Sequence, residues 1–297
     1  MSNIVITDEL LIEELKLRFQ EKKESLEKLE RITAELKEVN AKLAESESLK
    51  SHFISNITNE IVNPFTSIVV LSKNILSVKE SDWDKVKRMA SLIHSEAFNL
   101  DFQLKNIFAA AEIEAGELFM EVSNVKVDLL IEALLESFLP ETTKKQLNFE
   151  FIKEEPEGDD FIFKIDPEKL KLILSNLVDN AIKFSKNNKI IVKRWTEENQ
   201  LFISVQDFGI GISEKNQEII FDRFRRVDSG INSINRGHGL GLSINKALLD
   251  FLNGDIKIKS KKNEGTTFTI SIPEPDEDPE AFSADGNELI FGDDEIF

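Results

Sequence analysis

The sequence contains no cysteine and no tyrosine, and only 7 of its 297 residues are proline. Without cysteine, disulfide frameworks and thiolate metal sites are excluded, and the composition agrees with a reducing compartment. No apolar run approaches the ~18 residues of a membrane-spanning helix. The N-terminus also lacks the basic segment of a secretory signal. These absences predict a cytoplasmic protein without a membrane span.

Positive charge is also scarce, since 37 Lys and Arg against 55 Asp and Glu give a formal net charge of −18. This argues against a nucleic-acid partner, because affinity for a phosphate backbone depends on Lys and Arg. Ten of the acids fall in residues 273–297, which contain no Lys or Arg, and we expect this acidic tail to be disordered. Its pieces Asn287–Phe291 and Asp293–Phe297 place apolar residues directly after acids. That order suits a docking peptide, for a basic partner or for the arginines of residues 223–236, as well as a solubilising end.

The N-terminal residues 10–49 are rich in Glu, Lys and Leu and contain no Gly or Pro, which is typical of a long helix. A heptad row runs along it through Leu15, Phe19, Lys22, Leu26, Leu29, Thr33, Leu36, Asn40 and Leu43. Asn40 takes an a position, where a buried amide fixes register and favours two strands. We predict a parallel dimeric coiled coil over residues 1–49, with a single surface helix as the alternative.

Residues 50–116 read as two apolar-striped helices with a short connection. Pro64 should kink the first, a capping box at Ser81 and Asp84 opens the second, and Gly116 ends it. One hairpin cannot cover its own apolar stripes, so two hairpins from a homodimer would form a four-helix bundle.

Residues 117–272 alternate short strands and helices, which predicts an α+β domain with one mixed sheet covered by helices. Asp128 should cap a helix ending near Leu139, and Asp166 with Pro167 should begin a helix over Lys169–Ser185. The expected strands are Leu118–Val122, Leu147–Ile152, Phe161–Ile165, Lys189–Trp195, Leu201–Gln206, Asp255–Ser260 and Thr266–Ile272.

The helix over Lys169–Ser185 carries a polar stripe opposite its apolar face. Asn176, Asn180 and Lys183 stand at i, i+4 and i+7 and therefore share one side of the helix. Asn is a poor residue for a helix interior. The stripe is either a solvated surface or a cleft wall in which amides bind a metal and an ammonium meets phosphate.

Two glycine motifs follow, and each is weak alone. Asp207–Gly211 reads DFGIG directly after a strand, so its carboxylate can accept a hydrogen bond from an exocyclic amine beside close-approaching backbone. Gly237–Gly241 reads GHGLG before a helix, where amides can face phosphate.

The order NLVDNAIKFS, DFGIG, FDRFRR, GHGLGLSI and GTTF resembles the motifs of sensor histidine kinases, over about Leu49–Pro273. The resemblance implies a Bergerat-fold domain that binds ATP or ADP with Mg²⁺. It implies that Asn180 ligates Mg²⁺ with Asn176 near the phosphates, and that Lys183 and Arg226 contact phosphate. It also implies that Phe184, Gly209 and Gly211 surround the base, and that Asp207 binds the adenine amine, helped by Thr267 through water. Gly237, Gly239 and Gly241 would shape a lid hinge.

One position departs from the family, which reads Ser-His-Glu-Leu-Arg-Thr-Pro-Leu where this chain has Thr58–Phe65, TNEIVNPF. Asn59 stands in the place of the phosphoacceptor His, and an amide nitrogen is not a nucleophile because its lone pair is delocalised. The sequence predicts no self-phosphorylation. Glu60 and Asn63 match the ExxT/N signature of response-regulator phosphatases, although Asn63 also suits a cap before Pro64.

Four interpretations remain open. The chain is a degenerate kinase that dephosphorylates a response regulator receiver domain, an ATP-binding dimeric scaffold, or a kinase acting on a histidine of another histidine kinase. The fourth is an engineered His-to-Asn form of an active kinase. Rapid ATP hydrolysis is not expected, because gyrase-like ATPases place a Glu base where Asn176 stands.

Overall fold

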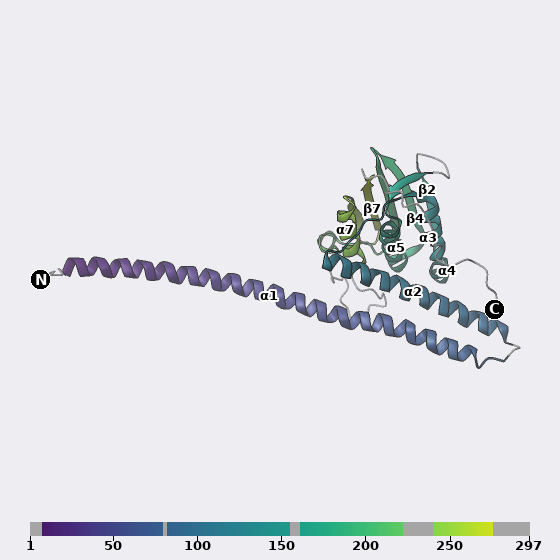
Figure 1. Ribbon diagram of the computed structural model, residues 1–297, viewed down its shortest axis with the longest axis horizontal. Coiled ribbons are helices and arrows are strands. Elements are labelled where there is room, and N and C mark those ends of the chain that lie inside the picture. Colours follow the sequence, from purple (N-terminus) through teal and green to yellow (C-terminus); the bar gives the residue numbers. More distant parts are fainter. Residues whose placement is uncertain (1–7, 80–81, 155–160, 222–239, 276–297) are drawn as a thin grey trace, which may run out of the picture. The chain divides into compact units, whose positions relative to one another are not determined.

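The computed structural model describes residues 8–79, 82–154, 161–221 and 240–275, without the side chains of residues 8–12, 14, 38, 41–60 and 187. The chain divides into two compact units, Met1–Ile57 and Thr58–Phe297, and each is described by itself. The helices are α1 (Asp8–Ile75), α2 (Trp83–Ala115), α3 (Val127–Ser137), α4 (Leu139–Lys145), α5 (Pro167–Phe184), α6 (Glu214–Gln217) and α7 (Gly241–Phe251). The strands are β1 (Ser123–Lys126), β2 (Asn148–Lys153), β3 (Ile162–Ile165), β4 (Ser185–Glu197), β5 (Gln200–Gly209), β6 (Asp255–Lys261) and β7 (Gly265–Pro273) (Figure 1).

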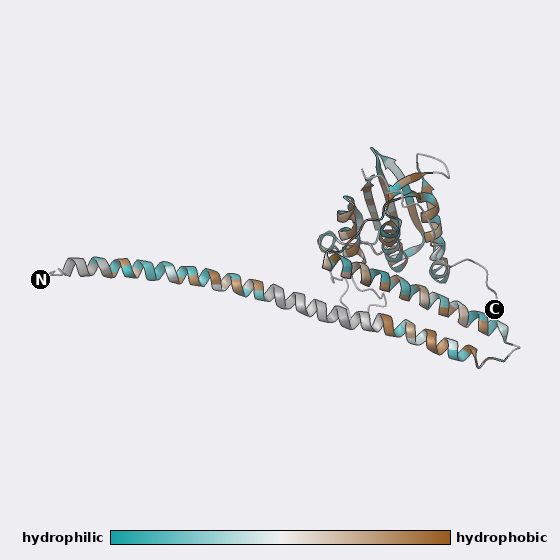
Figure 2. Cartoon of the chain, in the orientation of Figure 1, coloured by the Kyte–Doolittle hydropathy of each residue, from teal (hydrophilic) through white to brown (hydrophobic). Residues whose placement is uncertain are grey.

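The predicted N-terminal helix is confirmed as part of α1, which is continuous over 68 residues. Apolar residues recur along it among hydrophilic ones (Figure 2). Five members of the heptad row are more than half exposed: Leu15, Phe19, Leu26, Leu29 and Leu36. No helix among the described residues combines the length and apolar character needed to cross a membrane.

Helix α2 ends as expected at Gly116, whose φ of 69° lies in the left-handed region that favours glycine. The helix packs on the α/β domain through one stripe, where Phe102, Asn106 and Ala109 are buried. The ring of Phe138 meets Phe98 and Phe102 edge-on at 5.3 and 6.3 Å between centroids. The remaining face of α2 is more exposed, with Leu92 and Phe108 at least half exposed.

The domain contains two sheets rather than the single mixed sheet that the sequence predicted. The larger has the strand order β2-β4-β5-β7-β6, with β2 parallel to β4 and the other pairs antiparallel. The smaller pairs β1 with β3, and its β1 is Ser123–Lys126 instead of Leu118–Val122. Burial explains the shift, because Val125 lies buried opposite Phe163 whereas Phe119 remains 76% exposed.

The core lies between the larger sheet and helices α5, α7 and α3. Helix α5 begins as predicted, since the Asp166 carboxylate accepts the backbone N–H groups of Glu168 (3.1 Å) and Lys169 (3.0 Å). The apolar side of α5 is fully buried through Leu170, Ile173, Leu174, Leu177 and Val178. Burial of these side chains sets the rotation of α5 about its axis and therefore the direction in which its polar stripe faces.

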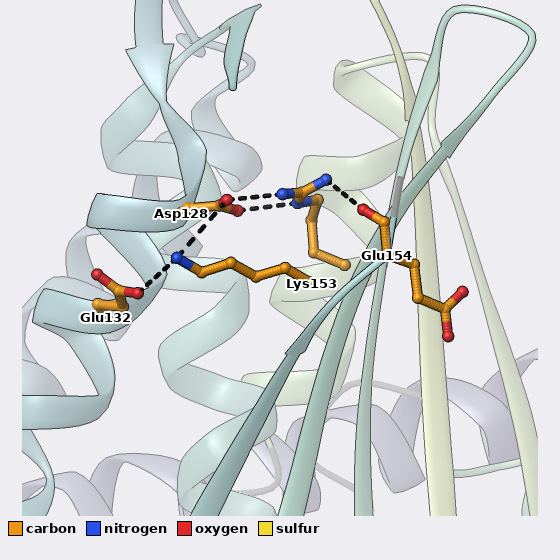
Figure 3. Close-up of polar contacts among 5 residues, drawn as sticks. Asp128, Glu132, Lys153 and Glu154 are labelled. Atoms are coloured by element: carbon orange, nitrogen blue, oxygen red, sulfur yellow. Dashed lines mark hydrogen bonds and ion pairs between the residues drawn. The ribbon is translucent and has the colours of Figure 1, made fainter. Parts of the chain in front are cut away.

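Asp128 does not cap α3 as the sequence suggested, because it lies inside the first turn and its carboxylate is buried. The fully buried guanidinium of Arg194 donates to both of its oxygens, at 2.8 and 2.6 Å. Arg194 also donates to the Glu154 carbonyl (2.8 Å), and Lys153 lies 3.9 Å from Asp128 (Figure 3). Asp128 is therefore satisfied by a bidentate arginine in the core and not by the backbone of the helix start.

Candidate nucleotide-binding site

Asp207 lies near the end of β5 and is only 6% exposed. Its Oδ1 accepts the backbone N–H of Gly209 at 2.8 Å, and no described Lys, Arg or His forms an ion pair with it. Burial raises the pKa of Asp207 to about 6, although backbone hydrogen bonds from Gly209 and Thr266 act in the opposite direction. A buried carboxylate without a cation is well suited to accept a hydrogen bond from a neutral N–H donor.

The loop after Asp207 is held between α5 and the β6–β7 turn. The α-carbon of Gly209 lies so close to the Phe184 carbonyl that a Cβ would collide with it, and the same carbonyl accepts the N–H of Ile210 (3.3 Å). Gly211 has a φ of 62° and packs against backbone at Lys261. Both glycines of DFGIG are therefore required by close backbone approach, and the loop is fixed beside the carboxylate.

The polar stripe of α5 serves two different purposes. Asn176 is 3% exposed, and its Nδ2 donates to Asn245 Oδ1 (2.9 Å) and to the Gly241 carbonyl (3.4 Å) on α7. Asn180 is half-buried and forms no hydrogen bond with a described residue. The structure thus uses Asn176 to hold α7 and leaves the amide of Asn180 available for a ligand.

Asn245 is a site residue that the sequence reading missed. It is fully buried, and its Nδ2 donates to the Ile173 carbonyl of α5 (3.0 Å) while its Oδ1 accepts from Asn176. An Asn in the apolar half of α7, GLSINKALLDF, was the available signal, because a buried amide needs partners.

The end of α5 carries two further candidate residues. Lys183 forms an ion pair with Asp179 at 2.5 Å, so it must leave that partner to reach a phosphate, and Phe184 is half-buried. Lys145 of α4, also missed, donates from Nζ to the carbonyl oxygens of Ile182 (2.8 Å) and Lys183 (3.4 Å). Partial burial lowers the pKa of Lys145, and its ammonium caps the C-terminal carbonyls of the helix.

The structure places Thr266, rather than Thr267, beside Asp207. Asp207 pairs with Thr266 in the sheet, and Thr266 is buried with its Oγ1 2.9 Å from Ser260 Oγ. Side chains alternate along a strand, so Thr267 lies on the opposite face of the sheet. The sequence could not choose between the two threonines, because the choice depends on the register of β7 against β5.

The remaining predicted residues are only partly covered by the structure. Gly241 begins α7, while Arg226, Gly237 and Gly239 lie outside the described residues. Asn59 and Glu60 lie in α1 with side chains that are not described, and Asn63 is exposed one turn further along. The structure therefore brings together Asp207, Gly209, Gly211, Phe184 and Gly241 around α5.

The donor groups fit an adenine nucleotide better than a metal held by protein alone. No described group of three His, Asp or Glu side chains lies close enough to hold a metal ion. Mg²⁺ commonly keeps waters and binds through substrate phosphates with one or two protein oxygens. The amide oxygen of Asn180 can supply one such ligand.

Comparisons with known proteins agree with this geometry. Residues 165–276 match the family of histidine kinase-, DNA gyrase B-, and HSP90-like ATPases. The circadian input-output histidine kinase CikA of Synechocystis sp. is 31% identical over 278 residues, covering 91% of this chain and 36% of that protein. Sensor protein GacS of Pseudomonas syringae pv. syringae is 31% identical over 262 residues, covering 85% of this chain and 28% of that protein. The chain thus spans only about a third of the length of these relatives.

Two solved structures share the fold. Full-length ShkA in complex with AMPPNP superposes with a TM-score of 0.53 at 20% identity, over 77% of this chain and 46% of that one. Histidine kinase AdeS of Acinetobacter baumannii gives a TM-score of 0.50 at 19% identity, over 73% of this chain and 98% of that one. Residues 165–276 thus match the family of histidine kinase-, DNA gyrase B- and HSP90-like ATPases, and most of the chain is similar to part of sensor histidine kinases.

Proposed function

We propose that residues 117–272 bind ATP or ADP with Mg²⁺, and that Asp207 recognises the exocyclic amine of adenine. The observation that carries this proposal is a buried carboxylate that forms no ion pair with a described cation and lies next to a glycine loop fixed against α5. The carboxylate of Asp207 accepts the N–H of the adenine amine. On α5, Asn180 binds Mg²⁺ and Lys183 contacts phosphate. The AMPPNP complex of ShkA supports this reading by its fold.

Calorimetric titration with Mg-ADP and Mg-ATP tests nucleotide binding. We expect saturable heat, and Asp207→Asn should weaken binding about 10- to 100-fold because a charge-assisted hydrogen bond contributes ~1.5–3 kcal/mol. Asp250→Asn, an exposed aspartate of α7, is the matched control and should leave affinity unchanged. Absence of heat and of a thermal shift with either nucleotide would refute the proposal.

We further propose that the protein acts in two-component signalling without phosphorylating itself. Asn59 occupies the place of the acceptor histidine in residues 58–65, and its amide cannot attack the γ-phosphorus of ATP. Incubation with labelled ATP should leave the unmodified chain unlabelled, and Asn59→His should gain an acid-labile phosphoryl group because Glu60 remains beside it. An acid-labile phosphoryl group on the unmodified chain contradicts this proposal.

The proposed activity is hydrolysis of the aspartyl phosphate of a response regulator. Asn63 is exposed on α1 and orients a water molecule, which attacks phosphorus and releases inorganic phosphate and the free aspartate. A receiver domain phosphorylated with acetyl phosphate should lose phosphate faster with the protein than alone. Asn63→Ala should abolish the acceleration, whereas Asn74→Ala, an exposed amide of the same helix, should not.

The same assay separates the other interpretations. No acceleration with bound nucleotide would favour a dimeric scaffold. Transfer of label from ATP to a histidine-bearing partner kinase would favour action in trans.

We propose that the protein works as a homodimer, with residues 1–49 as a coiled coil and 50–116 as half of a four-helix bundle. Support comes from exposed apolar residues on α1, including Val62, Phe65 and Val69 at 49%, 58% and 49%. Light scattering should give twice the mass of 33.8 kDa. Leu29→Glu with Leu36→Glu should weaken the dimer, whereas Glu30→Lys should not.

A further inference from the structure

One face of the five-stranded sheet is not packed by α5 and α7. Along β5 and β7 buried side chains alternate with half-exposed ones, and the buried set faces the helices. The half-exposed set belongs to the opposite side, which we call the open face. By strand register this face is composed of Glu150 and Ile152 of β2, Ile191, Lys193 and Trp195 of β4, Phe202, the buried Ser204 and Gln206 of β5, Thr267, Thr269 and Ser271 of β7, and the exposed Lys257 and Lys259 of β6.

The open face combines an aromatic end with a basic edge. Trp195 and Phe202 are paired in the sheet and stacked, with ring centroids 5.3 Å apart and an interplanar angle of 12°. At the edge strand, Lys257 and Lys259 are exposed, and neither forms an ion pair with a described carboxylate. Small hydroxyl side chains of β7 lie between the aromatic end and the basic edge. Such a surface suits a peptide that carries both aromatic and acidic side chains.

The chain itself delivers such a peptide to the aromatic end. Strand β7 ends at Pro273, which pairs with Gln200, and the N–H of Glu274 donates to the Asn199 carbonyl at 3.1 Å. This places the exit of the chain two residues along β5 from Phe202. The following residues 276–297 contain nine acids, no Lys or Arg, and the apolar groups of Leu289, Ile290, Phe291, Ile296 and Phe297.

We propose that residues 276–297 dock on the open face of their own chain. Their aromatic and aliphatic side chains lie on Trp195 and Phe202, and their carboxylates pair with Lys257 and Lys259. A stretched peptide advances ~3.3 Å per residue while neighbouring strands lie ~4.8 Å apart, so half of the segment is long enough to cross the sheet. This proposal does not depend on nucleotide binding.

Trp195 reports on docking in the full chain once the other tryptophan is removed by Trp83→Phe. We expect acrylamide quenching of Trp195 to rise roughly twofold when residues 276–297 are deleted, as for an aromatic side chain uncovered by a peptide. Lys257→Glu with Lys259→Glu should give the same rise in the full chain. Lys171→Glu with Lys215→Glu, two exposed lysines of α5 and α6, is the matched control and should not.

Salt and protein concentration sharpen the test. Quenching in the full chain should approach that of the truncated chain as salt increases, because exposed charge pairs are screened. Equal quenching of the full and truncated chains at low salt overturns the proposal. Protection that appears only at high protein concentration also overturns it, in favour of a second copy. Deletion that tightens nucleotide binding without changing Trp195 overturns it in favour of docking on the arginines of residues 223–236.

Discussion

Two of the three buried aspartates among the described residues, Asp128 and Asp207, have opposite surroundings. Asp128 is 1% exposed, and its two oxygens accept hydrogen bonds from Nε and Nη2 of the fully buried Arg194. Asp207 is 6% exposed and pairs with no described cation, and burial raises its pKa to about 6 although backbone N–H groups act in the opposite direction. The carboxylate of Asp128 holds α3 on the sheet through Arg194. The buried charge of Asp207 instead lowers the stability of the nucleotide-free protein. Such a loss of stability is expected of a carboxylate that binds a ligand. A protein cation paired with Asp207 would occupy the position that the N–H donor of the ligand needs.

Removal of Arg194 gives the strongest test of the contrast between the two aspartates. Arg194→Met should destabilise the domain by about 3–5 kcal/mol, since it leaves the charge of Asp128 buried with only Lys153 near it. Urea unfolding monitored by circular dichroism measures the loss. The double variant Arg194→Met with Asp128→Leu should recover much of it, because both charges are then absent. A loss as small as that of an exposed salt bridge would mean that the pair is not buried in solution.

The second aspartate should respond with the opposite sign. Asp207→Asn should stabilise the nucleotide-free protein by about 1–3 kcal/mol, because it removes a buried charge whose pKa is raised by about two units. The same variant should bind nucleotide more weakly. Thermal unfolding with and without Mg-ADP records both effects. Destabilisation without nucleotide would show that Asp207 has a structural role like that of Asp128.

The pH dependence of stability and of nucleotide binding gives a further test of the role of Asp207. Because the folded pKa of Asp207 lies above the unfolded value of 3.8, its contribution to stability decreases as pH rises from about 4 to above 6. Adenine binding should change in the reverse direction and strengthen as pH rises through 6, because the ionised carboxylate is the acceptor. The difference between the unmodified protein and Asp207→Asn isolates both slopes. Parallel curves for the two proteins would contradict the assignment.

An effect on stability similar in size to that of Asp207→Asn is expected from the amides that join α5 and α7. Asn245→Ala should destabilise the domain by about 1–3 kcal/mol, because it removes a second hydrogen bond to the Ile173 carbonyl and leaves one buried N–H of Asn176 without a partner. It should also weaken Mg-ADP binding several-fold by loosening the start of α7. Ser137→Ala removes a hydrogen bond within α3 and is the control, which should affect stability but not nucleotide affinity. An affinity unchanged in Asn245→Ala would make the pair purely structural.

Sequence reasoning succeeded where chemistry is local. The cap at Asp166, the glycine at the end of α2 and the period of α5 depend on neighbours within one or two turns, and the structure has all three. It failed where a choice depends on distant partners. The apolar residues Phe119 and Met120 suggested a strand, but the pairing of Val125 with Phe163 selected residues 123–126 instead.

For the candidate site, the sequence by itself determined the motifs, namely the carboxylate and glycines of DFGIG and the polar stripe of α5. Only the tertiary structure decided their roles. It directed Asn176 toward α7, set Thr266 rather than Thr267 beside Asp207, and capped α5 with Lys145. Strand register and helix packing join residues that are tens of positions apart, and no local pattern encodes which of two neighbouring side chains will face a shared site.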